Sequence, residues 1–115
     1  EAVDSLVLSN AVRMGVIGLE KTLSKELAPA VRANAVLPGT IETPRLTELV
    51  EDAVDRGDYE SYEEGLADWS GDIPLGRVGE PSELGDVVAF LSSERSSYLN
   101  GAAIPIDGGE ISATL

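Results

Sequence analysis

The chain has 115 residues, and 21 Asp and Glu residues against 8 Lys and Arg give it a formal net charge of −13. This length allows one domain, and 43% apolar residues are enough for a packed core. The absence of Cys and His excludes disulfides, thiol catalysis, imidazole bases and most transition-metal sites, so no metal site is expected. So negative a chain repels phosphate backbones, which excludes nucleic acid as an expected partner.

No apolar run approaches the roughly 20 residues that a membrane-spanning helix needs, and the chain does not begin with a secretory signal pattern. We therefore expect a cytoplasmic protein without membrane association. The eight cations are six Arg and two Lys. Excess acid with few Lys is typical of proteins that stay soluble in concentrated salt, where the Debye length falls to about 3 Å at 1 M. A halophilic protein is therefore predicted, and an ordinary acidic surface is the alternative.

Residues 5–28 are predicted to form one long helix, because Leu and Val recur at steps of three and four. A second face carries Ala11, Gly15 and Gly18. Because each Gly inside a helix costs about 1 kcal/mol relative to Ala, we expect a partner helix, or a sheet surface, to approach closely there. Pro29 ends the helix because it has no backbone N–H to donate.

Residues 31–37 are short and apolar on both faces, which is typical of a buried strand, and Pro38-Gly39 ends it. Residues 45–72 are predicted to form a surface excursion of two short helices. Between positions 42 and 72 the chain carries eleven carboxylates against two Arg. Three apolar or aromatic residues of this excursion are expected to pack inside it: Tyr62, Leu66 and Trp69.

The Gly- and Pro-rich residues 73–79 predict a loop, and a helix over 81–93 starts with Pro81 in the favoured first position. Residues 102–106 predict a second strand. Two strands joined through helices imply a parallel pair with a right-handed crossover. Because two strands make a poor sheet, at least one is expected to have a free edge or a missing neighbour, as in a piece of a larger α/β domain.

Short motifs in this order resemble the short-chain dehydrogenase/reductase family, in particular members similar to 3-oxoacyl-[acyl-carrier-protein] reductases. The resemblance covers nearly the whole chain, and its strength lies in the order and spacing of the matches. The motifs are Val16-Ile17-Gly18-Leu19, Leu27-Ala28-Pro29, Asn34-Ala35-Val36, Pro38-Gly39-Thr40-Ile41-Glu42-Thr43-Pro44, Gly76-Arg77 with Glu80-Pro81, and Gly101 before Pro105-Ile106-Asp107-Gly108-Gly109.

The resemblance implies an α/β fold, namely the C-terminal part of a Rossmann-type doubly wound parallel sheet. Residues 1–115 would be the C-terminal half of one such domain, with 45–72 as the substrate lid and no second domain. It also implies NAD or NADP as cofactor and a small carbonyl or alcohol substrate. A homo-oligomer, dimer or tetramer, would form through the 5–28 helix, the 81–93 helix and the 102–106 strand.

The family's catalytic Tyr and the Lys four residues after it correspond to Ser9 and Arg13 in this chain. A Ser hydroxyl is far less acidic than a phenol, and Arg stays protonated, so Arg13 could bind a ribose or phosphate but not relay a proton. The same two residues could instead be plain helix residues, one of them paired with Asp4 or Glu20.

The loop after the first strand matches the family residue by residue at Pro38, Gly39, Ile41 and Thr43. The resemblance implies that main-chain groups near Ile41 and the Thr43 hydroxyl hold the nicotinamide, with Arg13 as a further cofactor contact. The other interpretation is a plain strand-to-helix turn in which Thr43 caps the helix that begins at Pro44.

Two functions are therefore open. The first is part of an NAD(P)-dependent oxidoreductase similar to 3-oxoacyl reductases, although the strongly negative surface disfavours an acidic carrier protein as substrate carrier. The second is a catalytically degenerate member that serves as a nucleotide-binding or oligomerisation module. The 115-residue piece alone is expected to be inactive.

Overall fold

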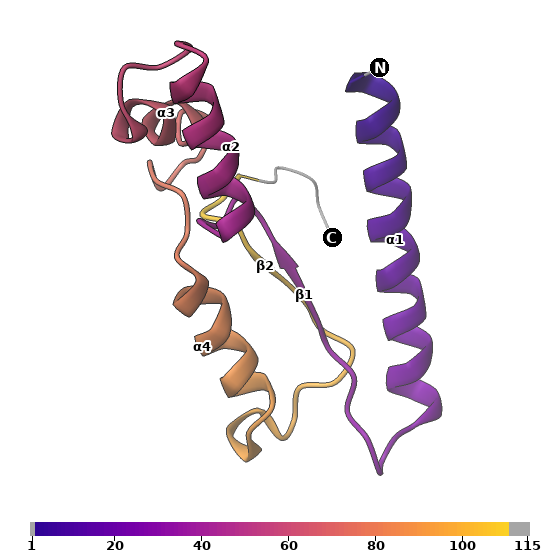
Figure 1. Ribbon diagram of the computed structural model, residues 1–115. Helices are drawn as coiled ribbons and strands as arrows, with labels where there is room; N and C mark the ends of the chain where they lie inside the picture. The colour runs from indigo at the N-terminus through magenta and orange to yellow at the C-terminus, as the bar shows by residue number, and fades with distance from the viewer. Residues whose placement is uncertain (1, 111–115) are drawn as a thin grey trace. The chain divides into compact units, whose positions relative to one another are not determined.

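The computed structural model describes the backbone of residues 2–110 and the side chains of residues 11–110. Its elements in chain order are the helix α1 (Ala2–Glu26), the strand β1 (Ala35–Pro38), the helices α2 (Pro44–Asp55), α3 (Tyr62–Trp69) and α4 (Pro81–Leu91), a 3₁₀ turn (Glu94–Ser96) and the strand β2 (Ala103–Ile106), as Figure 1 shows. This confirms the predicted order of long helix, strand, two short helices, helix and strand. No helix of the described residues is long and apolar enough to cross a membrane.

The two strands pair in parallel. Ala35 donates its N–H to the carbonyl of Ala102 at 2.8 Å, and Gly39 donates to that of Ile106 at 3.0 Å, so the same register holds at both ends of the sheet. Both predicted strands are too long. Residues 31–34 are not part of the strand, because Asn34 turns its amide onto the other segment, accepting from Ala102 N and donating to Leu99 O. That side chain takes the place of ladder hydrogen bonds.

The helix boundaries also differ from the predicted ones at their C-terminal ends. The first helix ends at Glu26 rather than at residue 28, and the fourth ends at Leu91 rather than at 93. Ser93 ends the fourth helix early, because its side chain caps the 3₁₀ turn by accepting from Arg95 N and also donates to the carbonyl of Phe90. Such local side-chain bonds compete with the helix.

The chain divides into two compact units. Among the described residues, unit 1 comprises 2–36 and 90–104, and unit 2 comprises 37–89 and 105–110. Unit 2 holds a small apolar core of Leu46, Val50, Ile73 and Val78, against which Tyr62 and Leu66 pack. This confirms the predicted packing for these two lid residues. Trp69, in contrast, is 42% exposed and contributes to the surface.

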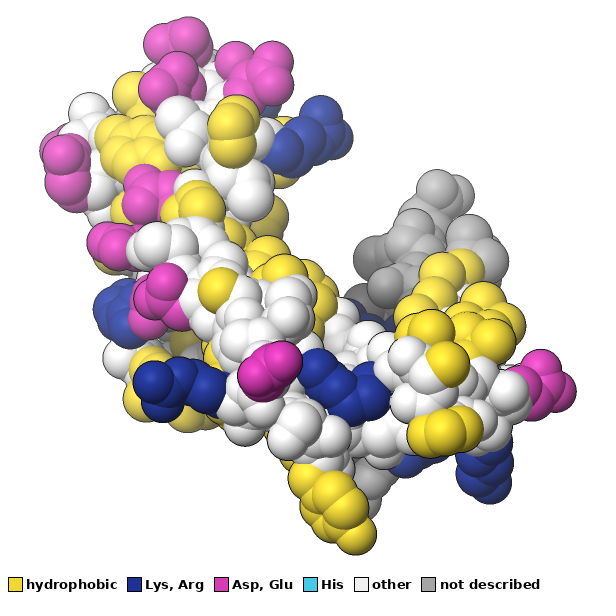
Figure 2. Space-filling model, turned by 90° about the horizontal axis from the view of Figure 1, so that it is seen from below, with side chains coloured by type: hydrophobic (Ala, Val, Ile, Leu, Met, Phe, Trp, Pro, Cys, Tyr) yellow, Lys and Arg dark blue, Asp and Glu magenta, His cyan; other side chains and the backbone are white. Residues whose placement is uncertain are grey.

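Unit 1 has a different interior. Lys21 donates to the carbonyl of Gly101, and Asn100 donates to that of Ser24, so polar side chains tie the segment 99–101 to α1. The predicted apolar stripe of α1 is exposed at Val12, Val16 and Leu19. Figure 2 shows Asp and Glu side chains gathered on one side of the visible surface, and hydrophobic side chains mixed with charged ones on the other.

Candidate functional site

The loop after β1 forms the centre of the candidate site, and it begins with a glycine that the packing requires. Gly39 follows Pro38, the last residue of the strand. A Cβ atom on Gly39 would overlap the side chain of Asp107 and lie 2.8 Å from its Cα. Because real Cβ atoms do not approach backbone so closely, only glycine lets this loop pass beside the end of β2.

The next part of the loop is fixed by the segment before α4. Gly79 N donates to Thr40 O at 3.0 Å, and Glu42 N donates to Gly79 O at 2.8 Å, which makes an isolated parallel bridge. Ile41, at the centre of this bridge, has a side chain only 8% exposed. In such a bridge the N–H of Ile41 points away from Gly79, and it has no partner among the described residues. Within the described residues the Ile41 N–H is therefore a free donor, and the hydrogen bonds to Gly79 on either side of it fix its position.

Thr43 ends the loop as the N-cap of α2. Its hydroxyl oxygen accepts from Leu46 N at 3.3 Å, and Pro44 occupies the first turn of the helix. This confirms the helix-cap interpretation of Thr43. A hydroxyl that accepts a backbone hydrogen bond keeps its own hydrogen for donation, so the cap leaves Thr43 able to bind an acceptor.

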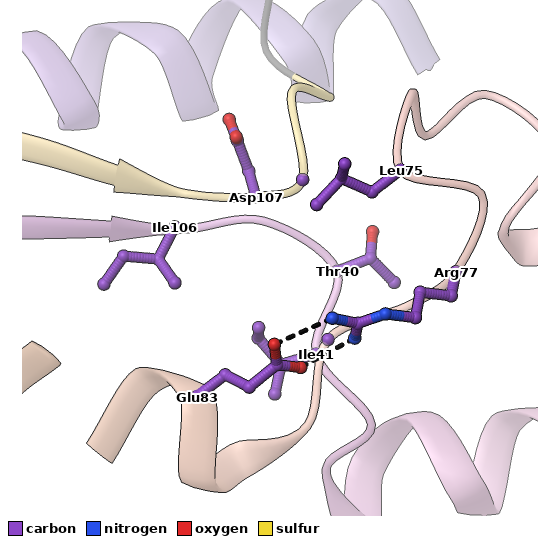
Figure 3. Close-up of a pocket in the computed structure, with 9 residues that line it drawn as sticks. Thr40, Ile41, Leu75, Arg77, Glu83, Ile106 and Asp107 are labelled. Carbon is purple, nitrogen blue, oxygen red and sulfur yellow. Dashed lines mark hydrogen bonds and ion pairs between the residues drawn. The ribbon is translucent and has the colours of Figure 1, made fainter. Parts of the chain in front are cut away.

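An ion pair braces the segment that holds the loop. Arg77 donates to both carboxylate oxygens of Glu83, at 2.7 and 2.8 Å, and Glu80 N donates to the same carboxylate at 2.9 Å (Figure 3). These bonds lower the pKa of Glu83 to about 2, with the Arg77 guanidinium as the largest cause. Both side chains are about half exposed, so the pair orients the segment more than it stabilises the fold.

These residues line a small pocket in unit 2 with a volume of about 50 Å³. Figure 3 shows the Arg77–Glu83 pair on one side of it, with Ile106 and Asp107 on the other. The lining residues are Thr40, Ile41, Leu75, Arg77, Gly79, Glu83, Ile106, Asp107 and Gly108.

A second hollow of about 300 Å³ lies beside α3 and shares Arg77 with the first. Glu42, from the loop, and Leu66, from α3, both line it. The Tyr62 hydroxyl donates to Glu42 at 2.7 Å and contacts the Thr47 hydroxyl at 3.2 Å, and so joins α3 to the loop and to α2. The Thr47 bond lowers the pKa of Tyr62, but the Glu42 bond, partial desolvation and nearby carboxylates together raise it.

The predicted site residues divide between the two units. Gly39, Ile41 and Thr43 lie together in unit 2 with the exposed Pro38, whereas Arg13 is half-buried on α1 in unit 1. Ser9 lies on the same helix, but its side chain is outside the described residues. The suggested pairing with Glu20 is wrong for Arg13, because neither carboxylate oxygen of Glu20 has a hydrogen-bond partner in the described part of the chain.

Sequence reasoning missed the bracing residues Gly79, Arg77 and Glu83. The ion pair could have been predicted from the sequence, because Arg77 and Glu83 carry opposite charges and lie six residues apart on either side of Pro81. The Gly79 bridge had none, because nothing in a sequence shows that two loops share backbone hydrogen bonds.

The parallel strand pair, the loop geometry and the helix order define a Rossmann-type α/β fragment, and a comparison with known families is consistent with this. Residues 2–110 match the family model described as Enoyl-(Acyl carrier protein) reductase. The chain therefore belongs to the short-chain dehydrogenase/reductase family.

Individual relatives support the same assignment. Over 100 residues the chain is 47% identical to the 3-oxoacyl-[acyl-carrier-protein] reductase FabG of Thermotoga maritima, covering 86% of this chain and 36% of that protein. The chain thus spans about a third of the length of this curated relative.

Two solved structures are also similar. L-sorbose reductase from Gluconobacter frateurii, complexed with NADPH and L-sorbose, aligns with a TM-score of 0.82 and 27% identity over 91% of this chain and 40% of that one. A short chain oxidoreductase from Pseudomonas aeruginosa, described as containing an atypical catalytic center, aligns with a TM-score of 0.77 and 32% identity. The alignment covers 90% of this chain and 40% of that one.

Proposed function

We propose that residues 1–115 form the C-terminal, nicotinamide-binding part of a single NAD(P)-dependent short-chain oxidoreductase domain. The whole domain would act on a carbonyl or alcohol substrate. The observation that supports this most directly is the braced loop, which presents the free N–H of Ile41 and the spare O–H of Thr43 in one rigid segment. The carboxamide of a nicotinamide offers an acceptor to such donors. When bound, the cofactor would supply the hydride, and the protein would orient it.

The charge of the hollow beside α3 bears on the class of substrate. The hollow lined by Glu42, Glu63 and Glu80 is acidic, with Arg77 as its one cation. A negatively charged carrier protein is therefore disfavoured at this mouth, and a neutral carbonyl compound of the 3-oxoacyl or polyol type fits better. The similarity to FabG and to L-sorbose reductase spans both types.

The catalytic positions support a second candidate, a degenerate member that binds nucleotide or assembles without turnover. By the resemblance, Ser9 and Arg13 replace the family's Tyr and Lys, and a hydroxyl of Ser and a guanidinium are poor groups for general acid–base catalysis. The related Pseudomonas structure with an atypical catalytic center indicates that departures from the usual residues occur among similar proteins.

We further propose a cytoplasmic homo-oligomer that uses the 5–28 helix, the 81–93 helix and the 102–106 strand. The exposed apolar side chains of α1 and the exposed Val88 and Phe90 of α4 support this proposal, since each lies on one of the proposed surfaces.

The cofactor assignment is tested in the full-length protein with Thr43→Asp and Thr43→Asn, two variants whose new side chains have nearly the same shape as each other. Asp and Asn both cap helices well, but only Asn can donate a hydrogen bond. Thr43→Asp is expected to bind NADPH or NADH at least about 3- to 10-fold more weakly than Thr43→Asn, the range expected for one hydrogen bond, measured by fluorescence titration. Equal affinities for the two variants would contradict the assignment.

The two candidate functions are separated by restoring the family residues. The wild-type protein is expected to oxidise NADPH or NADH slowly with a panel of acyl and polyol carbonyl compounds, monitored by absorbance. Activity that appears only in the Ser9→Tyr/Arg13→Lys double variant would favour the degenerate member.

A further inference from the structure

The segment that follows β2 supplies a carboxylate to the candidate cofactor loop. Glu110 accepts hydrogen bonds from both the N–H and the O–H of Thr40, a loop residue 70 positions earlier in the sequence. Its Oε1 lies 3.2 Å from the Thr40 N and 2.9 Å from the Thr40 hydroxyl oxygen, and its Oε2 lies 3.2 Å from the same hydroxyl. An ionised carboxylate only accepts, so two donors on one residue suit it well.

The turn before Glu110 holds this carboxylate in place. Glu110 N donates to Asp107 O at 3.1 Å, and Gly109 N donates to the Asp107 side chain at 2.9 Å. Gly108 and Gly109 have φ angles of 62° and 89°, in the region that L side chains rarely adopt. Leu75 N also donates to Gly108 O at 3.1 Å, which ties the turn to the rest of unit 2. Glu110 therefore reaches the loop from a fixed segment.

The contacts of Thr40 determine the orientation of the next peptide group. Its N–H and O–H donate to Glu110, and its carbonyl oxygen accepts from Gly79 N at 3.0 Å. The Thr40 carbonyl and the Ile41 N–H belong to one planar peptide group. Gly79 thus holds one atom of that plane, and Glu110 holds the residue from which the plane begins. Together they orient the N–H of Ile41.

The contact lies beside the candidate pocket rather than in the apolar core. Thr40, Ile41 and Asp107 all line that pocket (Figure 3). Glu110 is exposed, and an exposed hydrogen bond replaces one to water, so its net contribution to the free energy of unfolding is small. The contact therefore has more effect on the geometry of the loop than on the stability of unit 2.

We infer that Glu110 is a positioning residue for the nicotinamide: it orients Thr40, and Thr40 orients the Ile41 N–H toward the carboxamide of the cofactor. The inference rests on the proposed function, which gives the Ile41 N–H its role. Glu110 acts through Thr40 and not by contact with the cofactor. Without it, the N–H would have to be ordered when the cofactor binds, and that ordering costs affinity.

The inference is tested in the full-length protein with two ligands that differ by the nicotinamide. ADP-ribose is NADH without its nicotinamide, and 2′-phospho-ADP-ribose is the same fragment of NADPH. Glu110→Ala is expected to raise the Kd of the preferred dinucleotide about 3- to 10-fold and to leave the Kd of the matching fragment unchanged, as measured by calorimetric titration. A merely structural role would weaken both ligands alike, so an equal loss for both, or no loss for either, would overturn the inference.

Two further variants separate the hydrogen bond from the charge. Glu110→Gln keeps an acceptor oxygen for Thr40 and is expected to bind the dinucleotide as the wild type does. Glu48→Ala removes one negative charge at an exposed position of α2 and is expected to change neither Kd. A Gln variant as weak as the Ala variant, or a similar loss at Glu48, would assign the effect to charge and would overturn the inference.

A double-mutant cycle tests whether Glu110 acts through Thr40. Thr40→Val removes the hydroxyl that donates to Glu110 and keeps the backbone N–H. The effects of Thr40→Val and Glu110→Ala on the Kd of the dinucleotide are expected to be less than additive, and additive effects would overturn the inference. A wild-type protein that binds neither NADH nor NADPH would contradict the proposed function, and this inference with it. Wild-type binding that Glu110→Ala leaves unchanged would overturn the inference alone.

Discussion

The two units of this chain bury opposite kinds of side chain. The buried apolar residues of the described chain all belong to unit 2, whereas the buried side chains of unit 1 are polar, namely Glu20, Ser24 and Ser96. Unit 1 leaves the large apolar side chains of α1 in water. The buried apolar residues are Leu37, Ile41, Leu46, Val50, Ala53, Ile73 and Val78.

The difference shows which unit can form its interior from its own residues and which unit needs a partner. Unit 2 has a core, capped helices and a braced loop, so the candidate cofactor loop lies in the part that packs against itself. Unit 1 is held by side chains that donate to backbone carbonyls, such as Arg32 and Asn100, and its apolar surface still needs a partner. Contacts inside unit 2 should therefore determine folding of the site, and contacts of α1 should determine association.

The largest effect is expected from Gly39→Ala, which would break unit 2 at the candidate site. The added Cβ would overlap the side chain of Asp107 and lie 2.8 Å from its Cα. Because the obstacle is backbone, we expect a loss of about 3 kcal/mol or more in the free energy of unfolding, together with loss of NADPH binding.

The control for Gly39→Ala is Gly85→Ala in α4, where a new Cβ meets no atom within 4 Å. This substitution is expected to stabilise by about 0.5–1 kcal/mol, because Gly is costly in a helix. Urea unfolding of both variants measures the contrast, and a Gly39→Ala protein as stable as wild type would show that the close approach to Asp107 is wrong.

A second pair of substitutions compares the interiors directly. Val50 is fully buried in unit 2, so Val50→Ala is expected to cost about 2–3 kcal/mol at every protein concentration. Leu19 is 60% exposed on α1, and Leu19→Ala is expected to act on association instead. The dissociation constant of the Leu19→Ala oligomer, measured by analytical ultracentrifugation, should be about 5- to 30-fold higher than that of the wild type.

An outcome in which Leu19→Ala lowers folding stability as much as Val50→Ala, without changing association, would remove the distinction between the two interiors. It would mean that polypeptide of the same molecule covers this face of α1.

The elements with strong local signals could be predicted from the sequence. Pro81 and Thr43 mark helix starts, and the apolar periodicity gives α1 and α2 within a few residues. Two boundaries could not be placed: the C-terminal end of α4, where Ser93 caps the following turn, and the start of β1, where the Asn34 side chain replaces ladder hydrogen bonds. Periodicity also predicted α1's apolar stripe, but it cannot show whether anything covers that stripe.

The candidate loop was predicted from the resemblance, but its mechanical support was not. The bonds of Gly79 to Thr40 and Glu42 join segments about 40 residues apart, and their partners follow from tertiary packing. The burial of Glu20 was missed for the same reason. A Glu on a helix suggests a solvated or paired side chain, and only the packing of α1 on the neighbouring segment removes it from water.

Salt concentration is expected to act mainly on unit 2. Eleven carboxylates lie between positions 42 and 72, against Arg45 and Arg56. In dilute buffer the Debye length lengthens and their repulsion is unscreened, so we expect α2 and α3 to loosen first. Circular dichroism melts between 0.05 and 3 M KCl should show a rising melting temperature; melts that do not shift would contradict the halophilic prediction.

The smallest effect is expected from the ion pair that braces the loop. The pKa of Glu83 is lowered to about 2 in the folded protein, chiefly by Arg77, whereas an unfolded Glu titrates near 4.3. Because the folded pKa is the lower one, the contribution is complete above about pH 5 and is lost as the pH falls toward 2. It is modest, since both side chains are exposed to screening by water and salt.

Glu83→Gln is therefore expected to flatten the acid limb of the stability curve slightly below pH 5, without changing stability's dependence on pH above it. Glu48→Gln is the matched control, because the Glu48 side chain is exposed on α2 and makes no hydrogen bond to the described residues. Carboxyl NMR titration of Glu83 checks the cause: a midpoint near 4.3 would mean that Arg77 does not hold the carboxylate, and the bridge from Gly79 to the loop would then have to keep the segment in place alone.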